Sequence, residues 1–266
     1  MFVHVYDDGM LTPLPLARRD VIAERLAAGQ PVVAAALAQE FDVSEDAIRR
    51  DLRALAAEGR CRRVYGGALP VTPATQPMFA RIDESRGRKE ALARRAAESI
   101  QAGEFLFLDA GSTNLALTDF LPEDQELTVA TNSIDIAAAV LRRSDLRLIM
   151  VGGSVDATVG GCVDAAAVQA VAGFDIDRCF LGACAVDARG VGAALHADAL
   201  FKRALMAATR QCVVLALNEK FKARAPHRAC TLADVDLLVV EHDAPTRLTD
   251  PLRAAGPAIA RATRAA

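Results

Sequence analysis

The sequence has few of the residues that catalysis and metal binding use most often. It contains no tryptophan, two tyrosines and four scattered histidines among 266 residues. Its cysteines form no CxxC pair and no Cys/His group with zinc-like spacing; they stand at positions 61, 162, 179, 184, 212 and 230. We therefore expect no metal site, no cofactor, and reduced cysteines that pack as small hydrophobic side chains.

Long apolar segments are also lacking. No run approaches the ~20 residues that span a bilayer, and residues 1–16 lack the basic start and apolar stretch of a signal peptide. Nor is there an excess of positive charge, since the formal net charge is −3. We expect a cytoplasmic protein with no membrane partner, in which residues 1–16 form a flexible extension.

Charge is nevertheless distributed unevenly along the chain. Residues 49–63, RRDLRALAAEGRCRR, hold six arginines against Asp51 and Glu58, a local net charge of +4. Such patches matter more for phosphate binding than the total charge does. Residues 68–90 follow with three prolines and many polar side chains, which is typical of a linker. We therefore divide the chain near residues 70–85.

Three helices are predicted in the N-terminal part, over about 18–28, 33–40 and 44–59. Ser44 is a typical N-cap of the third helix, and the acidic residues after it suit the positive N-terminal end. Ile48, Leu52 and Leu55 lie at i, i+4 and i+7 and form a buried stripe. The other side chains of its first half therefore point outward: Glu45, Asp46, Ala47, Arg49, Arg50 and Arg53.

This exposed half predicts a DNA contact. A helix that follows its predecessor after a short turn and exposes its N-terminal half is what enters a DNA major groove. The stretch GRCRRVYGGAL then predicts a β-wing, with Arg62 and Arg63 on the phosphate backbone. Arginines on one helix are usually only a solvated face, but the combination favours a winged helix-turn-helix DNA-binding domain. We place it at 17–70, with a linker at 71–88.

The remaining residues, 89–266, are predicted to form an α/β domain with a mainly parallel sheet. Nearly continuous apolar runs mark strands at 105–109, 127–131, 146–151, 178–183, 212–217 and 236–241. Helix-like segments fall between most of these strands, as in βαβ units. Ligands of such sheets bind at the carboxyl ends of the strands.

Small, hydroxyl and amide residues recur at three of those strand ends. Glycines let backbone N–H groups approach an anion, hydroxyls add donors, and a lysine adds charge. Each piece alone is more simply a helix cap or a turn, but their recurrence favours one anion pocket. Its predicted members are Asp109, Gly111, Ser112, Thr113, Thr131, Asn132, Ser133, Gly152 and Gly153, with Lys202 or Lys220 as the cation.

Over roughly residues 18–242 the sequence resembles the DeoR family of bacterial transcriptional regulators. The stretches that carry the resemblance are LAQEFDVSEDAIRRDLRALAAEG and CRRVYGGA, followed by DAGST, TNS, VGG, DALFKRAL and LALNEKF. Leu217 and Glu219 replace an acid and a serine of the family's pattern, and Tyr65 replaces the wing histidine. The resemblance implies DNA contacts by Ser44, Arg49, Arg50 and Arg63.

It also implies a sensor domain with the fold of ribose-5-phosphate isomerase, which binds a small phosphorylated metabolite. Two functions then compete: a repressor of sugar or carbon metabolism genes that this effector releases from its operator, and a sugar-phosphate isomerase or transferase with an added DNA-binding-like domain. An isomerase needs a general base beside the reacting carbon, for which Asp109 and Asp198 are the nearby carboxylates.

A DNA-binding module would be pointless on a simple enzyme, and no Ser-His-Asp or metal constellation supports chemistry. We therefore predict a regulator without enzymatic activity. It would bind double-stranded operator DNA as a homodimer or homotetramer, because helix-turn-helix proteins bind repeated half-sites.

Overall fold

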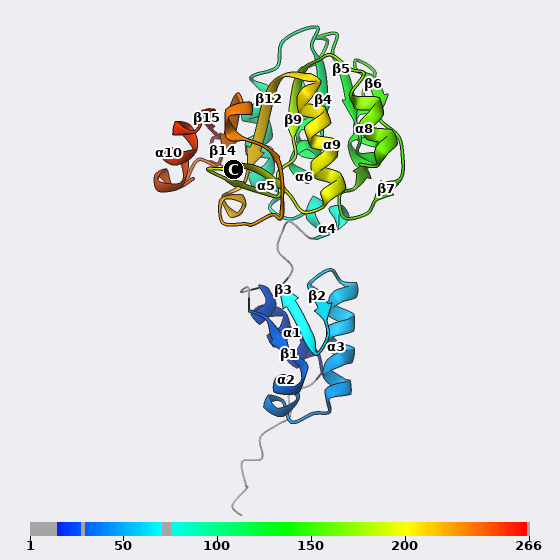
Figure 1. Cartoon of the computed structure of the whole chain (residues 1–266), viewed down its shortest axis with the longest axis vertical. Helices are drawn as coiled ribbons and strands as arrows, with labels where there is room; N and C mark the ends of the chain where they lie inside the picture. The colour runs from blue at the N-terminus through cyan, green and yellow to red at the C-terminus, as the bar shows by residue number, and fades with distance from the viewer. Residues whose placement is uncertain (1–14, 28–29, 71–75, 265–266) are drawn as a thin grey trace, which may run out of the picture. The chain divides into compact units, whose positions relative to one another are not determined.

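The structure, a computed structural model, describes residues 15–27, 30–70 and 76–264, without the side chains of residues 15–17, 27, 62 and 70. The chain forms two compact units, Met1–Thr72 and Pro73–Ala266 (Figure 1). Residues 1–14 of the expected extension, Ala28 at the expected end of the first helix, and residues 71–75 of the expected linker lie outside the described residues.

The described part of the N-terminal unit has three helices and a three-stranded antiparallel sheet of order β1-β3-β2. Its elements are α1 (Pro15–Ala27), β1 (Val32–Val33), α2 (Ala34–Glu40), α3 (Glu45–Ala57), β2 (Cys61–Val64) and β3 (Gly67–Pro70). The predicted stripe of α3 is buried in one apolar cluster with Ile22 and Leu26 of α1. The three predicted helices are present, but α1 begins at Pro15, inside the segment expected to be an extension.

A buried ion pair also joins α1 to α3. Arg18 is 6% exposed and Asp51 is 4% exposed, and Nε and Nη2 of Arg18 each lie 2.7 Å from Oδ2 of Asp51. Charges buried this deeply require a partner. Asp51, the acid of the IRRDL stretch, therefore holds α3 in place and faces the interior.

The wing turns at Tyr65 and Gly66, between β2 and β3. A Cβ on Gly67 would lie 2.1 Å from the carbonyl oxygen of Val32, so β1 can approach β3 only where that side chain is absent. The N–H of Ala34 donates to the carbonyl of Gly66 at 2.8 Å. These contacts fix the base of the wing against the start of α2.

Seven parallel strands form the central sheet in the described part of the C-terminal unit, in the order β15-β14-β12-β9-β4-β5-β6. They are β4 (Phe105–Leu108), β5 (Thr128–Thr131), β6 (Arg147–Met150), β9 (Ile176–Leu181), β12 (Thr209–Ala216), β14 (Leu237–Val240) and β15 (Ala258–Arg261). The predicted α/β fold is confirmed. The strand β15 was not foreseen.

Helices pack on both faces of this sheet (Figure 1). One face carries α5 (Arg86–Ala97), α6 (Ser112–Leu117) and α7 (Ile134–Val140); the other carries α8 (Ala165–Val171), α9 (His196–Ala207) and α10 (Thr246–Ala254). Along β4, Leu106 and Leu108 join the first apolar layer and Phe107 joins the second. Because both faces are buried, the strands appear in the sequence as unbroken apolar runs.

Smaller elements surround the sheet. They are α4 (Met78–Ile82), the hairpin of β7 (Val155–Asp156) and β8 (Gly161–Cys162), the antiparallel sheet of β10 (Ala185–Asp187), β11 (Gly190–Ala193) and β13 (His227–Cys230), and the short 3₁₀ turns η1 (Thr118–Phe120), η2 (Asn218–Phe221) and η3 (Leu232–Asp234).

The described part of the expected linker packs onto the C-terminal unit. Met78 is 1% exposed, and its N–H donates to the carbonyl of Ala157 at 3.4 Å. Arg81 donates from Nη2 to the carbonyl of Thr158 at 3.0 Å. Since α5 begins at Arg86, the boundary placed after residue 88 falls inside a helix. The prolines that indicated a linker stand before α4 and do not interrupt it.

The order of the strands creates a crevice at β4 and β9. The chain adds β5 and β6 on one side of β4, and β12, β14 and β15 on the far side of β9. The segments that leave these neighbouring strands therefore diverge. Such a switch point is where α/β sheets bind their ligands.

Candidate functional site

The first turn of α3 is exposed and capped as the sequence predicts. The hydroxyl oxygen of Ser44 accepts the N–H of Ala47 at 3.3 Å. Glu45 and Asp46 stand in the first turn, where the helix dipole stabilises negative charge. Ser44, Glu45 and Asp46 are exposed and Ala47 is half-buried.

Among the arginines of α3, Arg50 and Arg53 are the most available for an anion. Arg49 is held by ion pairs to Glu45 at 2.8 Å and to Asp46 at 3.3 Å. Arg50 and Arg53 are exposed and have no carboxylate within 4 Å in the described part of the chain. Their guanidinium groups can therefore turn to a phosphate or a base edge without breaking an ion pair.

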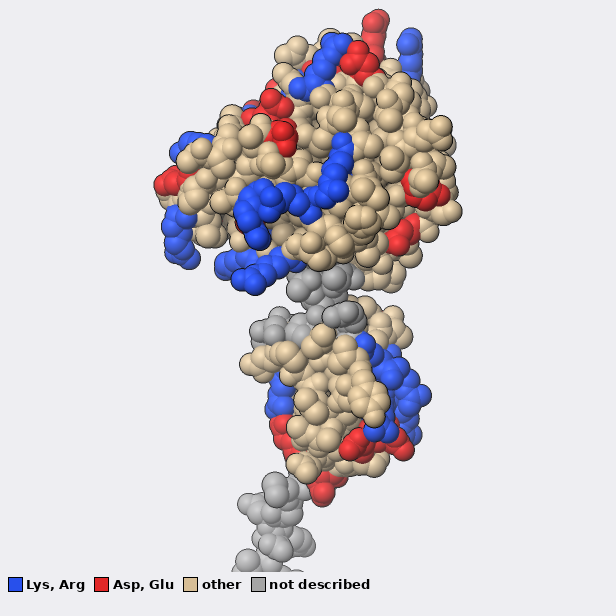
Figure 2. Space-filling model, in the orientation of Figure 1, with Lys and Arg blue, Asp and Glu red and all other residues tan. Residues whose placement is uncertain are grey.

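The wing adds exposed groups beside α3. Arg63 on β2 is exposed, and Tyr65 at the turn is fully exposed. Arg62 also lies on β2, but its side chain is outside the described residues. Lys and Arg side chains gather along the edge of the N-terminal unit where α3 lies (Figure 2).

A pocket opens at the switch point of the C-terminal unit. It is lined by Gly111, Ser112 and Thr113 after β4, by Gly182 and Ala183 after β9, and by Lys220 of η2. Four of the predicted site residues, Gly111, Ser112, Thr113 and Lys220, thus meet in one place. A Cβ on Gly182 would lie 2.6 Å from the carbonyl oxygen of Ala110, so the two loops can touch only at a glycine.

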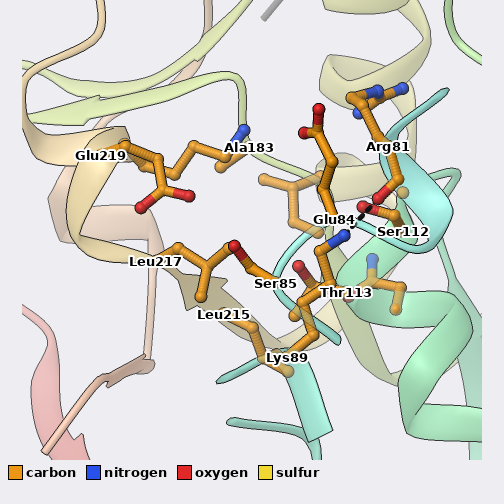
Figure 3. A pocket seen from close by; sticks show the side chains of 15 residues that line it. Arg81, Glu84, Ser85, Lys89, Ser112, Thr113, Ala183, Leu215, Leu217 and Glu219 are labelled. Atoms are coloured by element: carbon orange, nitrogen blue, oxygen red, sulfur yellow. Dashed lines mark hydrogen bonds between the residues drawn. The ribbon is translucent and has the colours of Figure 1, made fainter. Parts of the chain in front are cut away.

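The segment around α4 supplies the other wall. Figure 3 shows Arg81, Glu84 and Lys89 beside Ser112 and Thr113, with Glu219 across the pocket. The amine of Lys89 donates to the carbonyl of Arg81, and to that of Ile82 at 3.4 Å. It thereby ties α5 to the end of α4.

Burial makes the pocket cations easier to neutralise. Desolvation lowers the pKa of Lys89 to about 8 and also lowers the pKa values of Lys220 and Arg81. Nε of Arg81 is buried without a hydrogen-bond partner among the described residues. An anion placed among these cations stabilises their charged forms and so offsets the desolvation penalty.

The charge of Glu219 is partly balanced by Arg88. Nη2 of Arg88 lies 2.8 Å from Oε2 of Glu219, and the same guanidinium binds both oxygens of Glu241 at 2.6 Å. Leu217 beside it is 4% exposed and packs in the apolar layer under α5. The two departures from the DeoR-like pattern therefore fit their surroundings.

Asp109 and Lys202 lie beneath the pocket and do not line it. Asp109 is fully buried, and its Oδ2 accepts the N–H of Gly182 and the amine of Lys202, each at 2.8 Å. Lys202 also binds Asp198. Burial raises the pKa of Asp109. Burial opposes the charge of Lys202, but the two carboxylates outweigh it and raise its pKa. This ion cluster braces β4, β9 and α9.

The TNS stretch also acts from outside the pocket. The side-chain oxygen of Asn132 accepts the N–H of Ala110 at 3.0 Å, and its amide donates to the carbonyl of Cys162 at 3.1 Å. The hydroxyl of Thr131 donates to the carbonyl of Leu108 at 2.6 Å and accepts the N–H of Ser133. These bonds hold the loop after β4 in shape.

Gly152 and Gly153 lie apart from the pocket. Both are exposed and lead to Ser154, whose N–H donates to Asp164, the N-cap of α8, at 2.8 Å. The structure therefore gives the two glycines a place at a turn and does not bring them to the residues around Lys220.

Comparison with known proteins decides the family. A model described as the DeoR C terminal sensor domain matches residues 84–242, and one described as a DeoR-like helix-turn-helix domain matches residues 18–74. The chain belongs to the DeoR family. It is therefore a DNA-binding transcriptional regulator and not an isomerase or transferase, as the sequence predicted.

Transcriptional regulators are similar to this DeoR-family chain along most of their length. The uncharacterized HTH-type transcriptional regulator YgbI of Escherichia coli (strain K12) is 32% identical over 234 residues, which cover 87% of this chain and 92% of that protein. The glycerol-3-phosphate regulon repressor of the same strain is 29% identical over 218 residues, 81% and 86% of the two chains.

Among solved structures, ribose 5-phosphate isomerase A from Neisseria gonorrhoeae aligns with 54% of this chain and 56% of its own, at 16% identity. The TM-score is 0.39, which decides nothing about activity.

Sequence reasoning missed one wall of the pocket of this DeoR-family protein. Arg81, Glu84 and Ser85 fell in the stretch assigned to the linker, and Lys89 stands directly after it. Their signal was present in RIDESRGRKE, where charges of both signs surround a serine. A run of this kind is usually a solvated surface, and only the burial of Met78 and Lys89 distinguishes it.

Two further observations concern the described part of the chain. None of its helices has the length and apolar character that crossing a bilayer requires. No group of three or more His, Cys, Asp or Glu side chains there is arranged to hold a metal ion.

Proposed function

We propose that this protein represses genes of sugar or carbon metabolism and leaves its operator when a small phosphorylated metabolite occupies the switch-point pocket. The pocket carries the proposal, because it brings Lys220 and Arg81 together with the hydroxyls of Ser112 and Thr113. Cations and hydroxyls around a half-buried space suit a phosphate group. The printed names of relatives, among them the glycerol-3-phosphate regulon repressor, support the choice of metabolism.

The carboxylates of the pocket favour a ligand with more than a phosphate. Glu84 and Glu219 line the same space as Lys220. Ionised carboxylates accept hydrogen bonds and cannot donate them. A polyhydroxylated phosphate can place its anion near the cations and its hydroxyls near the carboxylates.

The same wall offers a route from pocket to DNA. Arg81 stands on α4, the first described helix after the DNA-binding unit. A ligand that binds Arg81 together with Lys220 would favour one position of α4. Operator affinity then changes if α4 also has a second position, in which the protein binds the ligand less tightly and the operator differently. We propose a homodimer or homotetramer, so that two α3 helices can occupy neighbouring half-sites.

Calorimetry and DNA-binding assays on the full chain test the proposal. Glycerol 3-phosphate, ribose 5-phosphate and other sugar phosphates would be titrated, with inorganic phosphate as reference, and release would be followed on an operator selected from random duplexes. Lys220→Met should weaken metabolite binding about tenfold or more, since a charge-assisted hydrogen bond contributes ~1.5–3 kcal/mol.

Lys222→Met removes the same charge from an exposed position two residues away and should leave metabolite binding unchanged. Equal affinity in wild type and Lys220→Met would refute the pocket assignment. Turnover of ribose 5-phosphate would refute the description as a regulator without enzymatic activity.

A further inference from the structure

A second positively charged surface lies on the C-terminal unit, outside the lining of the switch-point pocket. Its cations come from four separate segments: Arg189 before β11, Arg203 on α9, Lys222 and Arg224 after η2, and Arg228 on β13. All five are exposed. Arg189, Arg224 and Arg228 border one shallow hollow. Figure 2 shows Lys and Arg side chains gathered over this part of the unit, and we call these five residues the basic face.

The basic face is poorly neutralised by its own surroundings. Asp187 is the acidic residue among the described residues that line the hollow, and it pairs with Arg189 at 2.8 Å. Arg203 donates to the carbonyl of Arg228. In the described parts of the chain, Lys222, Arg224 and Arg228 have no carboxylate within 4 Å. In the hollow, three cations therefore face one carboxylate, whereas Arg203 borders a neighbouring hollow that also contains Asp234 and Asp236.

Elsewhere on the unit, arginines commonly have acidic partners. Arg95 pairs with Glu98, Arg143 with Asp145, and Arg210 with Asp175. The whole chain is acidic, with a net charge of −3, so the basic face does not follow from an excess of basic residues. Clustered like charges repel one another, and a polyanion bound across them relieves that repulsion.

We propose that the basic face binds phosphates of the DNA that flanks the operator. The chain is a DNA-binding regulator, so DNA is the polyanion that it is certain to meet. Once α3 holds the operator, the C-terminal unit of the same chain is kept near the flanking duplex at high effective concentration. Arginines suit phosphates, since the guanidinium binds them in a bidentate manner.

Salt dependence gives the sharpest measurement. Each phosphate contact adds about 0.9 to the slope of log affinity against log salt concentration. In the triple variant Lys222→Gln/Arg224→Gln/Arg228→Gln, three lost contacts should flatten this slope by roughly 2.7. The wild type should then lose about 40-fold more affinity than the variant between 50 and 200 mM salt. This is expected on a long duplex of about 60 base pairs centred on the operator.

The matched control is Arg142→Gln/Arg147→Gln/Arg247→Gln, which removes three exposed arginines outside the basic face that also lack carboxylate partners among the described residues. It should keep the wild-type slope. On a duplex cut to the operator alone, all three proteins should behave alike.

Equal slopes for wild type and the basic-face variant on the long duplex would overturn the proposal, and an acidic protein partner would give that result. A similar loss in the control variant would also overturn it, because the effect would then be one of total charge. Thermal unfolding of each variant shows whether it is folded, and hydroxyl-radical footprints should be shorter for the basic-face variant alone.

Discussion

The buried ion pair of the DNA-binding unit predicts a large effect of a change at Asp51. This residue sits in the IRRDL stretch, between Arg50 and Arg53, which are predicted to contact DNA. Instead its carboxylate is 4% exposed and binds Arg18 of α1 through two nitrogens. Asp51→Ala would leave the Arg18 guanidinium buried without its partner. Removing one member of such a pair destabilises by ~3–5 kcal/mol.

We take the lower end, ~3 kcal/mol, because Arg18 lies near the start of α1 and its long side chain can turn toward water. A small domain has only ~5–15 kcal/mol of stability in total. Since ~1.4 kcal/mol corresponds to a factor of ten, opening of α3 should become about a hundredfold more frequent.

Hydrogen exchange of the α3 amides in the full chain measures this opening. Exchange in Asp51→Ala should be about a hundredfold faster than in wild type, while the sheet amides of the C-terminal unit keep their rates. The double variant Arg18→Met/Asp51→Leu should recover most of the protection, because it removes both charges together. If exchange in Asp51→Ala were unchanged, or the double variant were as labile as the single one, the ion pair would not be what holds α3.

Three further predictions concern contacts and pH. Arg50→Ala should lower operator affinity tenfold to a hundredfold, ~1–3 kcal/mol, in a gel-shift titration; Arg49→Ala should lower it less, since Arg49 is already held by Glu45 and Asp46, and the reverse order would contradict this. Thr113→Ala should leave operator affinity intact but blunt the response to the metabolite; normal release would exclude Thr113 from the pocket's function. The pKa of Lys89 is lowered by burial to about 8. Between about pH 8 and 10.5 the unfolded chain therefore binds more protons at this site, and stability should rise with pH. Denaturant titrations should show the rise in wild type but less of it in Lys89→Met, and parallel profiles would refute the assignment.

The fold was largely predictable because its signals are local. Strands such as β4 and β12 are buried on both faces, so each of them appears in the sequence as one apolar run. The third helix was equally clear, because Ser44 marks its start and the Ile48 stripe has helical spacing. The short strand β1 was missed, since two residues contain no periodicity. It exists because Gly67 admits the backbone at Val32.

The pocket was only partly predictable because its members depend on tertiary contacts. Lys202 and Lys220 were equal candidates by sequence, yet they differ in surroundings. Lys202 stands one helical turn after Asp198 and also reaches Asp109. Its charge is therefore neutralised by these two buried carboxylates. Lys220 lies on a turn beyond β12 and borders the pocket. The sequence does not show which residues lie next to each lysine in the folded protein, and those neighbours are what distinguish Lys202 from Lys220.

Some motif residues line the pocket, and others only hold the loops that line it. Hydroxyl and amide groups at strand ends suit an anion, but they equally suit the backbone groups that a turning chain leaves unpaired. Asn132 and Thr131 satisfy such groups at Ala110 and Leu108, and only the loop that they hold, at Ser112 and Thr113, borders the pocket. A substitution in TNS should therefore act on the ligand through the shape of that loop.

An ion pair with Arg88 explains why Glu219 is compatible with an anion pocket. An unpaired carboxylate there would repel a phosphate, but Arg88 lies against it and against Glu241. The guanidinium offsets part of the charge and leaves lone pairs of Glu219 to accept hydrogen bonds. This position then acts as an acceptor beside Lys220, where a serine would offer both a donor and an acceptor. Selectivity in this pocket should consequently depend on ligand hydroxyls that point toward Glu219.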